Sequence, residues 1–205
     1  MKPVAIIGYS GHAYVAIDIF ASNDTKVEAY FEANEKEYNP YNLSYKGIDS
    51  PEQISSIKEE MDFFIGIGDN NIRRKIYENL AEHKDIYANA IHSSAVLANN
   101  VQLGKGIMIA ANAVINPLAQ IGTGVICNTG SIIEHECKVG DFAHIGPGAV
   151  LCGNVRVGSG SFIGANAVVK QGVKIGTNVM VGAGSVVIND IEDNQTVVGN
   201  PSRKL

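Results

Sequence analysis

The stretch from Val139 to Gly158, VGDFAHIGPGAVLCGNVRVG, decides the fold, because an aliphatic residue stands at every sixth position. The same spacing continues without a break over seventeen positions. The series is Ile91, Leu97, Leu103, Ile109, Ile115, Ile121, Cys127, Ile133, Val139, Ile145, Leu151, Val157, Ile163, Val169, Ile175, Val181 and Val187. Cys127, the one exception, packs as a small hydrophobic residue. An α-helix repeats its apolar face every 3.6 residues, so this period predicts a parallel β-helix instead.

Each group of six residues, or hexad, predicts a short strand followed by a corner. The aliphatic residue points into the core, and a glycine that often follows it makes room where a Cβ atom would clash. Three hexads close a triangular coil, so 102 residues, seventeen times six, predict between five and six coils. The register never slips, which predicts no long insertion, and the polar tail from Ile191 to Leu205 is expected to cap the last coil.

The first part of the chain has a different pattern. Runs at 4–8, 27–31 and 63–68 are typical of strands, and segments at 13–21, 49–59 and 70–82 are typical of helices. Ile72, Ile76 and Leu80 are expected on one helix face. The βαβαβα order predicts a small parallel sheet covered by helices. We therefore expect two domains, residues 1–88 and residues 89–205.

The turn after the first strand, Gly8-Tyr9-Ser10-Gly11-His12, is a candidate phosphate-binding loop. Such a loop presents backbone N–H groups and the positive end of a helix to an anion. Glu32, at the end of the second strand, stands where a ribose-binding carboxylate is found. A tight strand–helix turn and an ordinary surface glutamate fit these residues equally well. Three strands form half of a dinucleotide fold, which favours a nucleoside diphosphate carrier.

Bulk properties exclude several classes of function. The chain has 205 residues, 45% of them hydrophobic, and a net charge of −5 without a Lys/Arg block, which argues against a nucleic-acid partner. Its apolar runs are too short to span a bilayer. The three cysteines Cys127, Cys137 and Cys152 are expected to be buried, reduced thiols of a cytoplasmic protein. They form no close cluster with histidine, so we expect no metal.

The segment from residue 127 to residue 146 holds the candidate chemistry. His135 lies between Glu134 and Glu136, and a neighbouring carboxylate can fix the tautomer of a histidine and make it more basic, as a general base requires. His144 lies half a coil away, so the two histidines cannot meet within one prism. This geometry suggests an active site between subunits, with His135 from one and His144 from its neighbour. A solvated corner residue is the alternative for either histidine.

The hexads at 91–190, the segment Ile133-Glu134-His135-Glu136-Cys137 and the run Ile67–Arg73 together resemble a known family. This family consists of the bacterial sugar acyltransferases of the sialic acid O-acetyltransferase and UDP-4-amino-sugar N-acetyltransferase type. The resemblance implies a Rossmann-like half domain joined to a left-handed β-helix, a homotrimer, and acetyl-CoA as the acetyl donor. It also implies N-acetylation of the C4 amine of a UDP-linked amino sugar, without a metal.

The resemblance assigns roles to individual residues. His135 is the implied general base, one of the neighbouring residues Glu134 and Glu136 orients it, and Asn128 contacts the oxyanion or the substrate. The implied coenzyme A groove contains His144, Ala165 and Ala183. The implied uridine diphosphate site contains Ser10, Gly11, His12, Glu32, Ala33 and Gly68.

Three other functions stay open from the sequence. The nearest is O-acetylation of a sialic acid or another sugar. A hexapeptide-repeat carbonic anhydrase would need three histidines around one metal, and the central hexads supply His135 and His144. A non-enzymatic solenoid with a nucleotide-sensing domain would have no need of a histidine between two glutamates.

Overall fold

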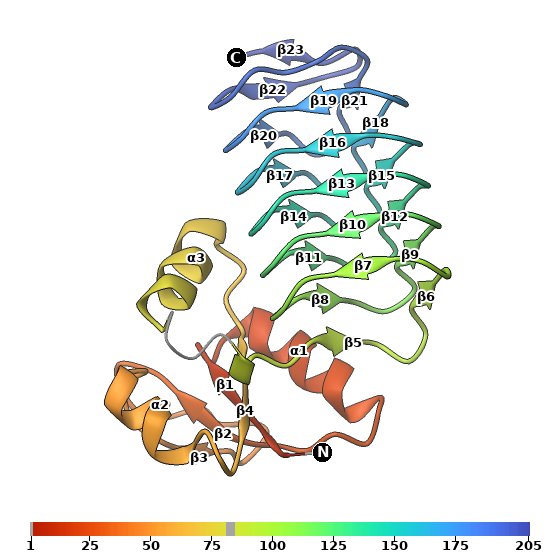
Figure 1. Ribbon diagram of the computed structural model, residues 1–205. Coiled ribbons are helices and arrows are strands. Elements are labelled where there is room, and N and C mark those ends of the chain that lie inside the picture. The colour runs from red at the N-terminus through yellow and green to blue at the C-terminus, as the bar shows by residue number, and fades with distance from the viewer. Residues whose placement is uncertain (1, 81–84) are drawn as a thin grey trace.

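The computed structural model in Figure 1 describes residues 2–80 and 85–205, which form a small α/β unit below a tall three-sided prism. The α/β unit contains a parallel sheet with the strand order β3-β2-β1-β4. Its strands are β1 (Val4–Ile7), β2 (Val27–Phe31), β3 (Ser44–Tyr45) and β4 (Asp62–Ile65). Its helices are α1 (Gly11–Ala21), α2 (Pro51–Ile57) and α3 (Asn70–Asn79). No described helix is long and apolar enough to cross a membrane.

The sheet departs from the sequence prediction in one strand and in several boundaries. β3 was not predicted, because two residues are too short to show an alternating pattern. The helix expected at 49–59 is confined to Pro51–Ile57, where the Ser50 side chain caps the first turn through the backbone N–H of Gln53. α3 ends at Asn79, and positions 81 and 82 of the predicted helix lie outside the described residues.

The three residues that were expected on one face of α3 differ in their burial. Ile72 is 49% exposed, whereas the neighbouring Arg73 is 1% exposed and Leu80 is buried. The helix turns Arg73 inward because this side of α3 meets the prism, whose corners offer hydrogen-bond acceptors rather than an apolar surface.

The prism has three faces, each a parallel sheet. The first face contains β5 (Ala90–Ile91), β8 (Met108–Ile109), β11 (Ile126–Cys127), β14 (His144–Ile145), β17 (Phe162–Ile163) and β20 (Met180–Val181). The second contains β6 (Val96–Leu97), β9 (Val114–Ile115), β12 (Ile132–Ile133), β15 (Val150–Leu151), β18 (Val168–Val169) and β21 (Val186–Val187). The third contains β7 (Gln102–Leu103), β10 (Gln120–Ile121), β13 (Lys138–Val139), β16 (Arg156–Val157) and β19 (Lys174–Ile175).

The six-residue period is confirmed as the period of the strands. Each strand from β5 to β21 ends on one of the predicted aliphatic positions, and neighbours on a face pair eighteen residues apart, as Ile121 does with Val139. From Ile109 to Val187 every one of these positions is buried in a single core. A Cβ atom added at Gly104 would lie 2.6 Å from the Thr123 nitrogen, so the glycines after the aliphatic residues do let the coils approach.

A second position recurs at the corners of the prism. In the hexads from Leu97 to Val181, the residue three places after the aliphatic position has a left-handed backbone, and most of these residues are Asn or Gly, which adopt it readily. Leu118 (φ 65°), Glu136 (φ 61°) and Phe142 (φ 57°) are exceptions. The tail closes the prism as expected. β22 (Thr196–Val198) pairs with β20, and β23 (Arg203–Lys204) pairs antiparallel with β22. Val197 is buried.

The α/β unit packs against the lower first face. Met108, Ala110 and Ile126 of the prism share one buried cluster with Ala13 and Ile17 of α1. This contact fixes the carboxyl ends of β1, β2 and β4 beside the coils that carry the candidate chemistry.

Candidate functional site

The predicted nucleotide loop lies at the carboxyl end of the parallel sheet, where ligands of open α/β sheets bind. Gly8 has a left-handed backbone, and Ser10 stands at the N-cap of α1 without a side-chain capping bond. Ser10 and Gly11 are exposed, so the first N–H groups of α1 lie at the surface. The exposure of these N–H groups is what an anion site would require, and the anion site itself stays a prediction.

Glu32 lies against this loop. Its carboxylate accepts a hydrogen bond of 2.9 Å from the backbone N–H of Tyr9 and forms a 3.2 Å ion pair with Lys36. Ala33 follows as an exposed residue, and Gly68, after β4, approaches the His12 ring. The sheet therefore brings the predicted substrate residues to one edge.

His12 and His144 meet where the α/β unit contacts the prism. Their ring centres lie 5.9 Å apart, and the His144 ring also contacts Phe162 at 4.7 Å. Burial lowers the pKa of His12 to about 4 and that of His144 to about 3, and the charge of Arg73 adds to both shifts. Both imidazoles are therefore neutral at pH 7.

Asn128 orients His144. Its side-chain N–H₂ group donates to Nε2 of His144 at 3.1 Å, and its Oδ1 accepts from the backbone N–H of Thr129 at 2.8 Å. Nε2 of His144 is therefore the acceptor nitrogen, and Nδ1 carries the proton. Among the described residues, Nδ1 of His144 and Nε2 of His12 are buried without a hydrogen-bond partner.

His135 projects from the corner between β12 and β13. Its Nδ1 lies 3.1 Å from the Glu136 carboxylate, and both side chains are 58% exposed. Because a carboxylate accepts the Nδ1 proton, Nε2 of the neutral ring is left as the basic nitrogen. The structure pairs His135 with Glu136, the residue held at a left-handed φ, and this pairing distinguishes Glu136 from Glu134.

The candidate residues of the prism occupy two different corners. His135 lies at the corner between the second and third faces, whereas Asn128, Ala165 and Ala183 lie at the corner between the first and second faces. Ala165 and Ala183 stand eighteen residues apart, directly above one another, half-buried and exposed respectively. One chain therefore does not bring His135 together with the predicted coenzyme A residues.

Arg73 is the site residue that the sequence analysis missed. Its guanidinium donates five hydrogen bonds: to the backbone oxygens of Ile67, Gly68, Gly124 and Phe142, and to Oδ1 of Asn70. Burial lowers its pKa to about 10, which leaves it charged at pH 7. Its neighbours in the sequence, Gly68 and Asn70, belong to the segment that carries the family resemblance.

The cysteines differ from one another in exposure. Cys127 and Cys137 are buried as expected, whereas Cys152 is partly exposed, which corrects its prediction as a buried thiol. Burial raises the pKa of Cys137 to about 11, so its thiol is protonated at neutral pH. Among the described residues no three His, Cys, Asp or Glu side chains gather as metal ligands.

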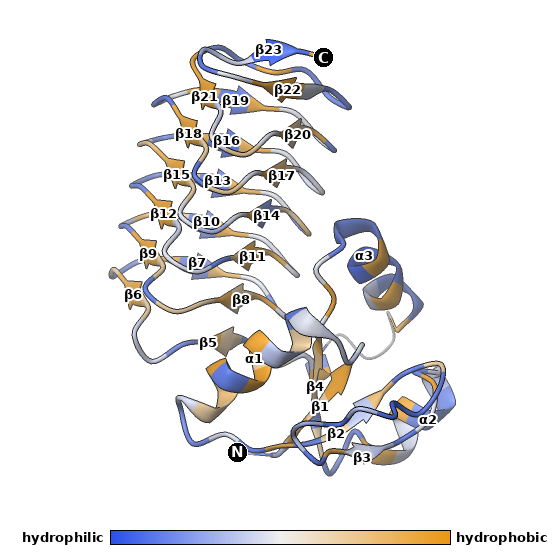
Figure 2. Ribbon diagram, turned by 180° about the vertical axis from the view of Figure 1, so that it is seen from behind, coloured by the Kyte–Doolittle hydropathy of each residue, from blue (hydrophilic) through white to orange (hydrophobic). Residues whose placement is uncertain are grey.

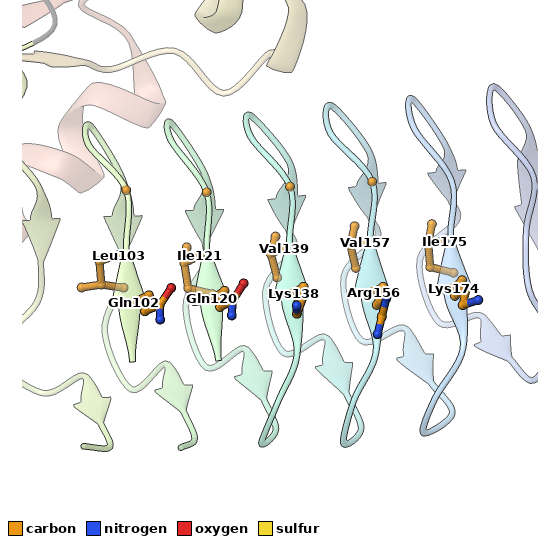
Figure 3. A pocket seen from close by; sticks show the side chains of 14 residues that line it. Gln102, Leu103, Gln120, Ile121, Lys138, Val139, Arg156, Val157, Lys174 and Ile175 are labelled. Atoms are coloured by element: carbon orange, nitrogen blue, oxygen red, sulfur yellow. The ribbon is translucent and has the colours of Figure 1, made fainter. Parts of the chain in front are cut away.

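Two of the grooves formed by the described residues lie on the prism. The larger, of about 630 Å³, runs along the third face, and the side chains of Gln102, Gln120, Lys138, Arg156 and Lys174 are among those that line it (Figure 3). The other, of about 480 Å³, separates the start of α3 from β17 and β20 and is lined by Gly68, Asn70, Phe162 and Met180. The second groove adjoins the residues that resemble a sugar-nucleotide site, so we regard it as the more relevant of the two.

Known proteins match both parts of the chain. Residues 3–80 match the PglD N-terminal domain family, and residues 154–189 match the bacterial transferase hexapeptide family of six repeats. UDP-N-acetylbacillosamine N-acetyltransferase of Bacillus subtilis is 35% identical over 115 residues, 54% of this chain and 52% of that protein. The chain thus matches about half the length of this curated relative.

Two solved structures match over nearly the whole length. Perosamine N-acetyltransferase from Caulobacter crescentus, a histidine variant in complex with CoA and GDP-perosamine, is 34% identical with a TM-score of 0.93, covering 100% of this chain and 97% of that chain. The acetyltransferase domain of PglB from Neisseria gonorrhoeae, in complex with acetyl coenzyme A, is 33% identical with a TM-score of 0.92, covering 100% and 99%.

These matches confirm the predicted fold class of a Rossmann-like half domain joined to a left-handed β-helix. They define a hexapeptide-repeat acyltransferase. The chain belongs to the bacterial sugar acyltransferase family, which confirms the family and the enzyme class predicted from the sequence.

Proposed function

We propose that the protein transfers the acetyl group of acetyl-CoA to the C4 amine of a nucleotide-linked amino-deoxy sugar. The observation that carries the proposal is the exposed His135–Glu136 pair, with Nδ1 3.1 Å from the carboxylate. The CoA and sugar-nucleotide ligands of the solved relatives support the two substrates. The division into a nucleotide-sugar domain, 1–88, and a transferase domain, 89–205, is part of the proposal.

The chemistry is a direct transfer. The neutral amine of the sugar attacks the thioester carbonyl, and Nε2 of His135 takes the proton that the amine loses as the C–N bond forms. Glu136 holds Nδ1–H and stabilises the imidazolium. The C–S bond then breaks, and the thiolate of CoA leaves and takes up a proton. The Asn128 amide is proposed as a contact to the oxyanion or the sugar.

The proposed assembly is a homotrimer with active sites between subunits. The outward residues of the second face are all aliphatic, and Figure 2 colours these strands as hydrophobic. They are Val96, Val114, Ile132, Val150, Val168 and Val186. Val96 is 58% exposed, and the others are half-buried. A continuous apolar strip of this kind favours contact with another copy.

The carrier is proposed to be UDP, as the resemblance implies, with GDP as the alternative because the Caulobacter crescentus relative binds GDP-perosamine. His12 and the N–H groups of Ser10 and Gly11 would contact the diphosphate, and Glu32 with Ala33 and Gly68 would contact the nucleoside. His144, Ala165 and Ala183 would line the coenzyme A groove. We place the reaction in the cytoplasm.

The test is a thiol-release assay with acetyl-CoA and four acceptors: a UDP-linked and a GDP-linked 4-amino-4,6-dideoxy sugar, a UDP-linked 2-amino sugar, and sialic acid. The proposal expects rapid release with the UDP-linked 4-amino sugar and loss of release in His135→Ala with an unchanged circular dichroism spectrum. Release with sialic acid alone would move the protein to O-acetylation. No release with any acceptor, in a protein that also fails to bind acetyl-CoA, would contradict the proposal.

A further inference from the structure

Gly153 is unique among the hexads of the prism. Gly153 stands two places after the aliphatic residue Leu151, and it is the only glycine at this position in the seventeen hexads. The other sixteen hexads have Ser, Asn, Lys, Ala, Pro, Thr, His, Asp or Gln there. Its backbone is not left-handed, so the conformation gives no reason for glycine. Ala165 and Ala183 occupy the same hexad position, which shows that this backbone accepts alanine.

The reason lies one coil below. A Cβ atom added at Gly153 would lie 2.6 Å from both Cε1 and Nε2 of His135 and 3.3 Å from its Cδ2. Real Cβ atoms do not approach other heavy atoms below about 3 Å. The His135 imidazole therefore lies over the bare Cα of Gly153, with its basic nitrogen against it.

The backbone around His135 gives little freedom to avoid a larger residue. The N–H of Asn154 donates to the His135 oxygen at 2.8 Å, and the N–H of Glu136 donates to the Pro117 oxygen of the coil below at 3.0 Å. With the main chain fixed on both sides, an added methyl group can be accommodated only by rotation of the imidazole. That rotation moves Nδ1 away from the Glu136 carboxylate.

We propose that Gly153 is a positioning residue for the reaction: its missing side chain is the space in which His135 keeps Nδ1 on Glu136 and Nε2 available as the base. The expected effect on the reaction rate rests on the proposed function. The expected effect on the position of the His135 ring does not depend on it.

The first test is Gly153→Ala. Alanine at a compatible backbone position reduces the entropy of the unfolded chain, so the melting temperature is expected to stay equal or to rise slightly. The kcat is expected to fall about 10- to 100-fold, as misplacement of a reacting group by about 1 Å does, with little change in the KM for acetyl-CoA. Asn189→Ala, two coils higher at the same corner, is the matched control and should keep normal kinetics.

A double-mutant cycle separates positioning from direct contact with a ligand. In a His135→Ala background Gly153→Ala should have no further effect on the residual rate. An equal fold-loss in both backgrounds, or a fall in acetyl-CoA affinity that accounts for the whole loss, would overturn the proposal.

A crystal structure of Gly153→Ala tests the placement independently of any activity. The His135 ring should be rotated and its bond to Glu136 broken. A ring that keeps the original position beside Ala at 153 would overturn the inference. If the unmutated protein shows no transferase activity while the ring is displaced in Gly153→Ala, the result counts against the proposed function alone.

Discussion

Arg73→Met should destabilise the protein strongly, although it replaces a charge by an apolar residue of similar length. Arg73 is 1% exposed and its five donors all have acceptors. Methionine leaves four backbone oxygens and the Asn70 amide without this partner. A buried acceptor without a bond costs about 1–3 kcal/mol, and relaxation with water entry reduces the sum, so we expect a net loss of about 3–5 kcal/mol. For a chain of this size that is a fall in melting temperature of about 6–20 °C.

The measurement is urea unfolding followed by circular dichroism, together with a thermal melt. Lys75→Met is the matched control, because it removes an exposed cation from the same helix and should change stability by less than about 0.5 kcal/mol. Hydrogen exchange of α3 should accelerate in Arg73→Met, since Gly124 and Phe142 are prism residues that this side chain ties to the helix. Equal stability of the two variants would refute the role of the guanidinium as the main polar connection between α3 and the prism.

Three further outcomes follow from the site and the faces. Glu136→Gln should lower kcat about 10- to 100-fold with the fold intact, because it weakens the partner of Nδ1; a larger loss in Glu134→Gln would reassign the orienting role. Val150→Asp places a charge on the aliphatic second face and should yield monomers in light scattering. Arg156→Asp on the third face is the control and should leave the assembly unchanged. A trimer that persists in Val150→Asp would exclude this interface. Acid should destabilise the protein below pH about 6.5, because the unfolded chain takes up protons on His12 and His144 there while the folded chain, with pKa values of about 4 and 3, does not. Each histidine contributes a slope of about 1.4 kcal/mol per pH unit in that window, so His144→Asn should roughly halve their joint slope, and an unchanged slope would show that His144 is not the source.

The prism was predictable because its information is local and repeated. The six-residue period predicts the buried residue of every strand, and the eighteen-residue spacing predicts its pairing partner on the next coil. The left-handed corner position could have been read in the same way, from the Asn and Gly residues three places after each aliphatic one. The two-residue strand β3 could not, since its pairing with β2 leaves no pattern in Ser44–Tyr45 itself.

The site was predictable only in its local part. His135 and Glu136 are neighbours in the sequence, so their contact follows from adjacency. Two of the acceptors of Arg73, Gly124 and Phe142, lie 51 and 69 positions further along the chain. Helical periodicity placed Ile72 on one face with Ile76 and Leu80, and it gave no signal for Arg73. Nothing in a helix pattern indicates that the opposing surface is a row of carbonyl groups. Burial in the same contact is the main cause of the lowered pKa of His144, and Arg73 and His12 add to it, so its neutral state is equally invisible in the sequence.

The faces of the prism explain why the proposed active site and the proposed trimer are one arrangement. The lower first face is covered by the α/β unit, and the third face carries Lys138, Arg156 and Lys174, whose mutual repulsion along one sheet disfavours burial. The aliphatic second face is the one that we propose to contact another copy. It separates the corner of His135 from the corner of Asn128, Ala165 and Ala183. In the proposed trimer, second faces would meet around a threefold axis, and the corner of His135 on one subunit would lie beside the corner of Asn128, Ala165 and Ala183 on its neighbour. The burial that removes the aliphatic strip from water would then also complete the site.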